Sequence, residues 1–367
     1  MNIYSDERIV LTLDAGGTNF VFNALQRGKA MIKDITRRAN GDDLNLCIET
    51  MKTGFREVIA AIVGKPVAIS FAFPGPADYP NGIIGDLYNL PAFRGGVPLK
   101  AILEEEFHLP VYINNDGDLY AYGEALGGIL PEINSKLESA GIKKRYHNLV
   151  GLTLGTGIGA GIVRKNQLFI GDNSAAAEVW LFSNRFSPQV NAEDVVSTRS
   201  VQRVYAKNAG LEYPNELMPK DIYEIATGNR EGNRDAALKA YHETGRALGD
   251  TIANLFTLID GIIVIGGGIT GAKDLYMPSV IQELNNNFYP SYINELPRLV
   301  QKIFNLDNAD EEAAFCKSYS KEIPVPGTNK TLTYDPVPRL AIATSRIGAS
   351  EAIALGAYAF ALFGEKE

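Results

Sequence analysis

Two glycine-rich turns with closely similar surroundings are the part of this sequence best suited to chemistry. The first is Asp14-Ala15-Gly16-Gly17-Thr18-Asn19, and the second is Leu154-Gly155-Thr156-Gly157-Ile158-Gly159. A strand pattern enters each turn and another leaves it, so each pattern predicts a hairpin. Glycines in such a bend let backbone N–H groups approach an anion and form a phosphate-binding nest. Either turn alone is compatible with an ordinary hairpin, whereas the pair predicts a site that grips a polyphosphate.

The two turns differ from other phosphate-binding motifs. A P-loop or a dinucleotide-binding turn opens directly into a helix whose N-terminus meets the phosphate, and neither turn does so. The candidate phosphate-binding residues are therefore Gly16, Gly17, Thr18, Asn19, Gly155, Thr156 and Gly157.

A third glycine segment, Gly266-Gly267-Gly268, follows a buried strand pattern and precedes a helix expected at about 275–288. With Gly271 it matches the spacing of a dinucleotide fingerprint. That fingerprint belongs with an acidic residue about twenty positions further on at a strand end, and here a helix occupies that region. We therefore expect these glycines to contact the adenosine side of a nucleotide.

Two aspartates lie at the ends of expected strands. Asp116 follows the strand 111–113, and ligands of open α/β sheets gather at the carboxyl ends of strands. One interpretation makes Asp116 a general base for an attacking alcohol and Asp118 the cap of the next helix; in the other, Asp116 or Asp118 merely caps that helix. We favour the first. Asp14 adjoins the first turn, where a carboxylate serves Mg²⁺ through water or simply closes an Asx-type turn.

The elements that position these residues alternate between strands and helices. Expected strands lie at 9–13, 20–25, 30–35, 67–73, 111–113, 149–154 and 261–265, and expected helices at 44–63, 99–107, 119–126 and 349–363. The same order of elements recurs after residue 149, which predicts an α/β fold of two similar halves. We expect a first lobe at 1–118 plus 345–367 and a second lobe at 119–344. Polar stretches at about 131–148 and 280–338 are expected to be surface insertions.

Composition supports a two-domain fold and argues against nucleic-acid-binding and membrane proteins. With 367 residues the chain exceeds the size at which single cores stop growing, so two domains are expected. A net charge of −8 and the lack of a basic run argue against nucleic-acid binding. Two cysteines, no export-signal pattern and interrupted apolar stretches predict a cytoplasmic protein without membrane contact.

These motifs resemble, in order, those of the ROK family of repressors and sugar kinases, within the actin-like ATPase superfamily. The resemblance covers most of the chain and includes both glycine turns, Pro74-Gly75-Pro76, Asn89-Leu90-Pro91, Asn115-Asp116-Gly117 and Ile265-Gly266-Gly267-Gly268. It implies a two-lobed, ribonuclease H-like fold with duplicated domains around a central cleft. It also implies transfer of the γ-phosphoryl group of ATP to a hexose hydroxyl, usually on carbon 6, with Mg²⁺, and a homodimer.

The resemblance assigns roles to individual residues. Asp116 becomes the base, and the sugar contacts become Gly75, Asn89, Asn115, Glu178 and Glu193. The family histidine three residues after Glu178 is replaced by Leu181, and residues 182–192 contain neither Cys nor His. No structural zinc is therefore expected. We expect packing around Trp180, Leu181 and Phe182 to hold this loop instead.

Alternative functions remain from other classes. A family repressor would carry a helix-turn-helix module before the first strand, where only residues 1–8 stand. Leu181 leaves open a catalytically silent sugar sensor, and an actin-like ATPase would hydrolyse ATP without sugar. Retention of Asp116 and both turns favours the kinase.

Overall fold

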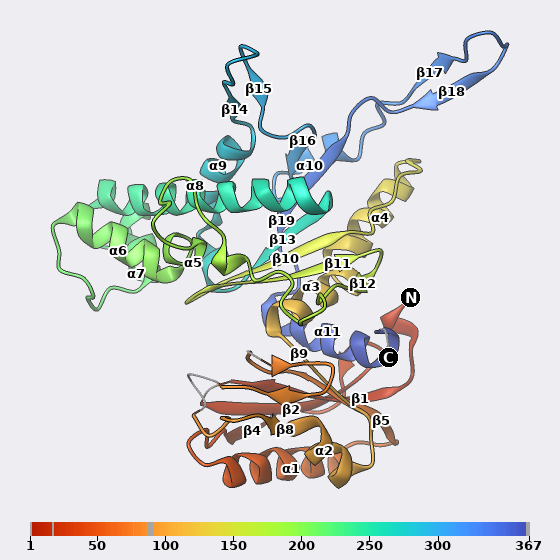
Figure 1. Cartoon of the computed structure of the whole chain (residues 1–367), viewed down its shortest axis with the longest axis vertical. Coiled ribbons are helices and arrows are strands. Elements are labelled where there is room, and N and C mark those ends of the chain that lie inside the picture. The colour runs from red at the N-terminus through yellow and green to blue at the C-terminus, as the bar shows by residue number, and fades with distance from the viewer. Residues whose placement is uncertain (1, 17, 76, 87–90, 365–367) are drawn as a thin grey trace. The chain divides into compact units, whose positions relative to one another are not determined.

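The computed structural model describes residues 2–16, 18–75, 77–86 and 91–364. Internal contacts divide the chain into two units. The first comprises residues 1–131, 160–177 and 345–367, and the second comprises residues 132–159 and 178–344. Both units combine strands with helices (Figure 1), which confirms the predicted α/β class. The division places residues 119–131 and 160–177, which we had expected in the second lobe, within the first unit.

The sheet of the first unit has the strand order β3-β2-β1-β5-β9, with β4 also pairing β2. Its strands are β1 (Ile9–Ala15), β2 (Asn19–Gln26), β3 (Lys29–Ala30), β4 (Ile35–Arg38), β5 (Pro66–Ala72) and β9 (Val111–Asn114). The hairpin strands β1 and β2 are antiparallel, whereas β1, β5 and β9 run parallel. Parallel strands end on the same edge of a sheet, so Asp14 and Asn114 lie on one edge. The single strand expected at 30–35 is instead divided between β3 and β4.

Helices cover both faces of this sheet. In Figure 1, α1 (Leu44–Ala61) and α2 (Leu99–Phe107) lie on one side, and α3 (Asp116–Leu126) and α11 (Ala349–Phe363) on the other. The α1 face has an aromatic core, in which the rings of Phe22 and Phe55 meet edge-on with centroids 5.2 Å apart. This unit also contains a small sheet of three strands, β6 (Ala77–Asp78), β7 (Ile83–Ile84) and β8 (Val97–Pro98). A short 3₁₀ helix, η1 (Ile3–Ser5), precedes β1.

Helices α3 and α11 pack backbone to backbone. A Cβ atom on Gly123 would lie 1.9 Å from the Ala352 carbonyl oxygen, and one on Gly356 would lie 1.8 Å from that of Leu119. Only glycine permits this approach. The predicted closely packed helix at 349–363 is therefore confirmed, since its small residues bring α11 against α3.

A second hairpin belongs to the first unit from Ala160 onward. Strand β11 (Ile158–Arg164) pairs antiparallel with β12 (Gln167–Leu168), and the turn residues Lys165 and Asn166 have φ values of 52° and 62°. The β2–β3 turn likewise has positive φ at Arg27 and Gly28. Two-residue turns with positive φ match the twist of hairpin strands. Both predicted strand-turn-strand units are thus present.

In the second unit, four parallel strands pair in the order β10-β13-β19-β16. They are β10 (Leu149–Leu154), β13 (Ile262–Gly266), β19 (Arg339–Thr344) and β16 (Lys302–Asn305). Every residue of β13 and β19 is buried, as expected for strands covered on both faces. The short strand β16 lies inside the segment 280–338, so part of this expected insertion belongs to the main sheet.

The helices of the second unit include the long α8 (Arg234–Ile259), which packs along α9 (Lys273–Leu284). Shorter elements are η2 (Val179–Leu181), α5 (Ala192–Val195), α6 (Thr198–Ala209), α7 (Pro219–Thr227), η3 (Gly268–Ala272) and α10 (Ala309–Phe315); α4 (Ile129–Ser139) spans the boundary between the two units in sequence. The helix expected to reach residue 288 ends at Leu284.

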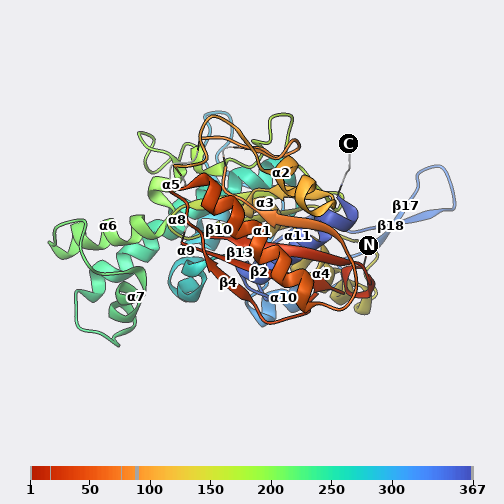
Figure 2. The same cartoon turned by 90° about the horizontal axis from the view of Figure 1, so that it is seen from below.

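Two hairpins extend from the second unit. They are β14 (Asn287–Phe288) with β15 (Leu296–Pro297), and β17 (Lys321–Pro324) with β18 (Thr331–Tyr334). The β17–β18 hairpin projects away from the rest of its unit in both views (Figure 1 and Figure 2), and nearly all its residues are exposed. Among the described residues, no helix combines the length and apolar character needed to cross a bilayer.

Candidate active site

Asp116 stands in the first turn of α3, directly after strand β9. The residue that caps this helix is Asn115, whose side-chain oxygen accepts the Gly117 N–H at 2.8 Å. Our assignment of the cap to Asp118 is therefore wrong; Asp118 lies inside the helix and is buried. The helix starts three residues earlier than expected because Asn115 is an effective N-cap. The Asp116 side chain is therefore not the N-cap of α3.

Asp116 as a whole residue is exposed, and one of its carboxylate oxygens accepts the Gly117 N–H at 2.8 Å. Its pKa is raised, chiefly because surrounding protein replaces the water that would solvate the charge; backbone N–H groups oppose this in part. An aspartate with a raised pKa at a strand end is suited to accepting a proton.

Tight packing fixes the start of α3 against the second hairpin. A Cβ on Gly117 would lie 2.5 Å from the Ala160 carbonyl oxygen, and one on Gly161 would lie 2.4 Å from that of Gly117. Strand β11 therefore runs directly along the segment that carries Asp116. Sequence reasoning treated Gly161 only as part of a repeated turn and missed this contact.

Asp14 lies near the end of β1, opposite Val21 of β2 and Ala72 of β5. Its pKa is raised by loss of solvation and, secondarily, by the negative charges of Asp116 and Asp34. Asp14 and Asp116 are thus close enough to interact, which a cation between them would favour. Gly16 forms a tight bend, since its Cβ would lie 2.9 Å from the Asn19 carbonyl oxygen; Thr18 and Asn19 are exposed, and Gly17 lies outside the described residues.

Tyr79 connects two of the predicted sugar contacts. Its buried hydroxyl donates to the Phe73 carbonyl at 3.0 Å and accepts the Asn115 side-chain N–H at 3.4 Å. The same hydroxyl lies 3.0 Å from the position of a Cβ on Gly75. Tyr79 thus supports both Gly75 and Asn115. No sequence signal identified it; the predicted contact Asn89 lies outside the described residues.

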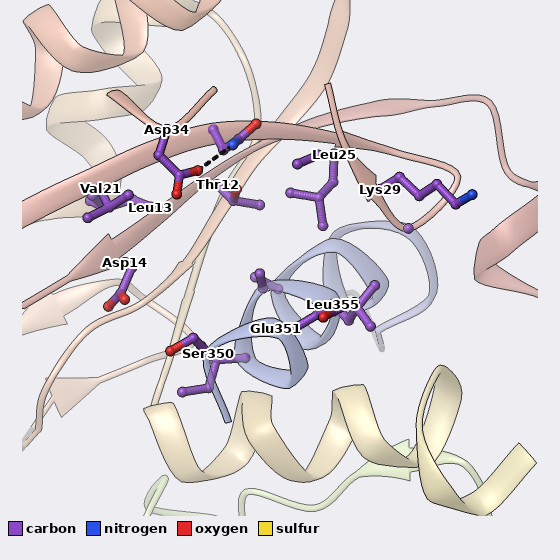
Figure 3. A pocket seen from close by; sticks show the side chains of 16 residues that line it. Thr12, Leu13, Asp14, Val21, Leu25, Lys29, Asp34, Ser350, Glu351 and Leu355 are labelled. Atoms are coloured by element: carbon purple, nitrogen blue, oxygen red, sulfur yellow. Dashed lines mark hydrogen bonds between the residues drawn. The ribbon is translucent and has the colours of Figure 1, made fainter. Parts of the chain in front are cut away.

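A cavity of about 470 Å³ adjoins Asp14 within the first unit. Figure 3 shows Asp14, Asp34 and Glu351 around it, together with apolar side chains such as Leu25 and Leu355. Asp34 is fixed there by the Asn23 side chain, which donates to it at 2.6 Å. No sequence pattern predicted this cavity between the hairpin strands and α11.

In the second unit, the Gly155–Gly157 turn is closed by a hydrogen bond from the Gly155 N–H to the Gly157 carbonyl at 2.9 Å. Glu193 lies against it, because a Cβ on Gly157 would meet a Glu193 carboxylate oxygen at 2.2 Å. The Arg199 guanidinium donates to Glu193 at 2.6 Å. A predicted sugar contact and a predicted phosphate-binding turn are therefore neighbours, and the exposed Thr156 lies between the two glycines.

Gly267 also adjoins this turn. It has φ 93°, and its Cβ would lie 2.3 Å from the Leu154 carbonyl oxygen at the end of β10. Gly266 ends β13 and Gly268 begins η3, where a Cβ would meet nothing within 4 Å. The second and third glycine segments are therefore brought together at one edge of the second sheet.

Glu178 precedes η2, and its carboxylate accepts the Trp180 indole N–H. Trp180 and Leu181 are 37% and 57% exposed, so for these two residues the predicted anchoring of the loop by packing is wrong; Phe182, the third residue of that prediction, is half-buried. The buried residue of the turn is Val179.

Comparison with known proteins identifies the family. The ROK family profile matches residues 10–304. The chain belongs to the ROK family. It resembles the crystal structure of a glucokinase from Parabacteroides distasonis ATCC 8503, with a TM-score of 0.90 and 48% identity over 99% of both chains.

Two further relatives are more distant. An N-acetyl-D-glucosamine kinase from Vibrio cholerae serotype O1 is 26% identical over 281 residues, covering 72% of this chain and 85% of its own. A glucokinase from Thermotoga maritima is 25% identical over 309 residues, which cover 77% of this chain and 89% of that glucokinase. This ROK protein is thus a sugar kinase with the two-domain actin-like ATPase fold.

The residues of this ROK kinase suit Mg²⁺ but not a structural zinc cluster. Mg²⁺ keeps several waters and needs only one or two carboxylates beside the phosphates of a substrate, and Asp14, with acidic neighbours, suits it. The described residues contain no cluster of three or more His, Cys, Asp or Glu side chains in ligating geometry. Residues 182–192 have no Cys or His, so a family-type zinc cluster does not fit this chain.

Proposed function

We propose that this protein transfers the γ-phosphoryl group of ATP to a hexose, on the 6-hydroxyl of glucose or a related hexose or N-acetylhexosamine, with Asp116 as general base. The observation that carries the proposal is Asp116 itself: an aspartate at a strand end, not used as the helix cap, with a raised pKa. The sugar kinase relatives support the same reaction.

Asp116 takes the proton of the sugar hydroxyl while the oxygen of that hydroxyl forms a bond to the γ-phosphorus. The bond from that phosphorus to the bridging oxygen breaks, and ADP leaves with the electron pair. Because little covalent chemistry is required of the protein, positioning and charge stabilisation supply most of the acceleration. A raised pKa brings Asp116 closer to working pH, where a general base is more effective.

In this proposal Asn115, Gly75 and Asn89 contact the sugar, and Glu178 and Glu193 accept hydrogen bonds from its hydroxyls. Tyr79 orients Asn115 through the contact of 3.4 Å. Glu193 would couple sugar binding to the position of the Gly157 turn, since its carboxylate lies against that turn.

The nucleotide is held by backbone N–H groups of the two turns, with Gly266–Gly268 beside the adenosine. Open space around Gly155 and Gly268 supports this placement, because backbone there is accessible to a ligand. Asp14 would hold Mg²⁺ through water, and the ion would neutralise charge on the phosphates. A homodimer is a further part of this proposal, from the family resemblance alone.

Glucose is our first choice of substrate, because the relative with 48% identity is a glucokinase. N-acetylglucosamine is the second, by similarity to the Vibrio kinase. Replacement of the family histidine by Leu181 removes a polar contact, and a lost hydrogen-bond partner shifts discrimination among hydroxyl and acetamido groups.

The test is ADP formation, in a coupled assay, with glucose, mannose, fructose, allose, N-acetylglucosamine and N-acetylmannosamine under identical conditions. We expect kcat/KM to be highest for glucose. A catalytically silent sensor, the alternative that Leu181 favours, would bind a sugar without producing ADP. ATP hydrolysis that no sugar stimulates would reject the kinase proposal.

A further inference from the structure

The segment between Glu178 and Glu193 lacks the features that usually order a loop. Apart from η2, its only pairing of strand type among the described residues is a bridge between Ser183 and Asn191. Trp180, Leu181 and Val190 are exposed and Phe182 and Phe186 are half-buried, so only Val179 and Ala192 are buried among the apolar side chains of the segment. Yet the segment carries one predicted sugar contact and leads into the other.

Polar contacts from the middle of the segment reach α8. The Asn184 side chain is fully buried and donates to the Ala247 carbonyl at 2.9 Å. The backbone N–H of Arg185 donates to an Asp250 carboxylate oxygen at 3.0 Å. These bonds place the loop against one turn of α8.

The Arg185 side chain extends this contact to α9. Its guanidinium pairs with Glu283 and lies 3.8 Å from Asp250. Gly249 allows the approach, because its Cβ would lie 2.6 Å from that of Glu283. The two carboxylates, on different helices, therefore face one arginine.

Arg298, from the segment between β15 and β16, completes the cluster. It pairs with both Asp250 and Glu283. The side chains of Arg298, Asp250 and Glu283 are only 6%, 4% and 3% exposed, whereas that of Arg185 is 35% exposed. Two positive and two negative charges balance, as buried ionised groups require.

We propose that this four-residue cluster is the cross-link that orders the sugar-binding segment, in the part of the chain where the family's zinc cluster does not fit. Arg185 is the positioning residue, and Arg298 holds the two carboxylates in place for it. The charges act as a metal cluster would, by joining a loop without regular structure to two helices. The proposal rests on the proposed function only in its kinetic consequence.

Arg185→Met is the informative variant, because it removes the charge while keeping the length of the side chain. Since Arg185 is partly exposed, we expect the protein to fold. A displaced loop should raise the KM for sugar about tenfold or more. The kcat at saturating sugar and the KM for ATP should remain within about threefold, since neither Asp116 nor the glycine turns are altered.

The matched control is Arg246→Met. The Arg246 guanidinium lies 4.2 Å from the centroid of Phe186, and that of Arg185 lies 4.8 Å from the same ring. Arg246 has no ion pair among the described residues. This variant should keep the sugar KM within about twofold of wild type. An equal rise in both variants would mean that stacking on Phe186, and not the ionic cluster, orders the loop.

Hydrogen exchange tests the cross-link without any reaction. The Arg185 amide, bonded to Asp250, should be protected in the ligand-free wild type and exchange at least about tenfold faster in Arg185→Met. Arg185→Lys should recover part of the protection, since it keeps the charge without the planar fork. Fast exchange at this amide in wild type, or an unchanged sugar KM in Arg185→Met, overturns the proposal. If wild type phosphorylates no sugar, the proposed function fails and exchange alone decides the cross-link.

Discussion

Replacing Asp116 with asparagine tests the proposed base most directly. The variant keeps a side-chain oxygen that can accept the Gly117 N–H, now at 2.8 Å, and leaves the Asn115 cap untouched. Asparagine has nearly the same shape but accepts no proton at working pH. The start of α3 should therefore be preserved while the chemistry is removed.

The expected loss can be bounded. Positioned general bases contribute roughly 10² to 10⁴ in rate, or about 2.7 to 5.5 kcal/mol in activation free energy. The raised pKa of Asp116 makes it a stronger base than a solvated aspartate, which favours a loss of about 10³-fold in kcat. The KM values for sugar and ATP should change little.

The assay is the coupled measurement of ADP over a range of pH. Protonated Asp116 cannot act as base, so wild-type activity should fall as pH decreases through its raised pKa, above the value of about 3.9 for a solvated aspartate. The variant should lack this acidic limb. A kcat within about tenfold of wild type, with the limb retained, would refute the assignment.

The same variant makes a prediction about stability. A carboxyl with a raised pKa in the folded state disfavours folding when ionised, so stability decreases as pH rises from the unfolded towards the folded pKa. Asp116→Asn should therefore have a higher Tm than wild type at pH 7, and the difference should vanish near pH 4. A lower Tm at pH 7 would show that the loss of activity reflects damage to the fold.

Three other predictions concern packing, the sugar site and metals. Gly161→Ala should lower the unfolding free energy by about 1–3 kcal/mol or more, because its Cβ meets the backbone of Gly117, whereas Gly271→Ala, with nothing within 4 Å, should be nearly neutral in the same denaturant titration. Tyr79→Phe should raise the sugar KM about two- to tenfold through loss of support for Asn115, and an unchanged KM would remove Tyr79 from the site. Enzyme treated with a strong chelator should regain full turnover with Mg²⁺ alone, and a requirement for added zinc would contradict the ionic cross-link.

Much of the fold follows from local patterns. The helix at 349–363 and the strand at 149–154 have the expected bounds, since small apolar residues at helical spacing and a short apolar run define them clearly. The start of α3 was misplaced because Asn115 and Asp118 are both good caps, and only the backbone decides between them. Strand β16 was missed because four residues in a polar segment carry too little signal; its burial comes from pairing with β19.

The site residues divide in the same way. Asp116 and Asp14 could be found because each follows a strand, and the topology of a parallel sheet then places both at one edge. Tyr79 and Arg185 could not, since their partners are distant in sequence: Tyr79 contacts Asn115, and Arg185 contacts Glu283. Such contacts depend on how elements pack, for which one sequence holds no periodic pattern.

The glycines of the repeated turns show most clearly that a sequence pattern and the packing in the structure can assign different roles to a residue. The repeated turns suggested one role for all their glycines, but the surroundings separate them into two kinds. Gly161 and Gly267 are needed because backbone carbonyls lie where their Cβ atoms would stand, so they fit strands and helices together. Gly155 and Gly268 have open space there, which packing does not explain. A requirement for close approach by a ligand would explain it, and the nucleotide of the proposed reaction is such a ligand, with its phosphates at Gly155 and its adenosine at Gly268. In the second unit, the phosphate-binding hypothesis therefore rests on Gly155 and the adenosine contact on Gly268, rather than either resting on a whole motif.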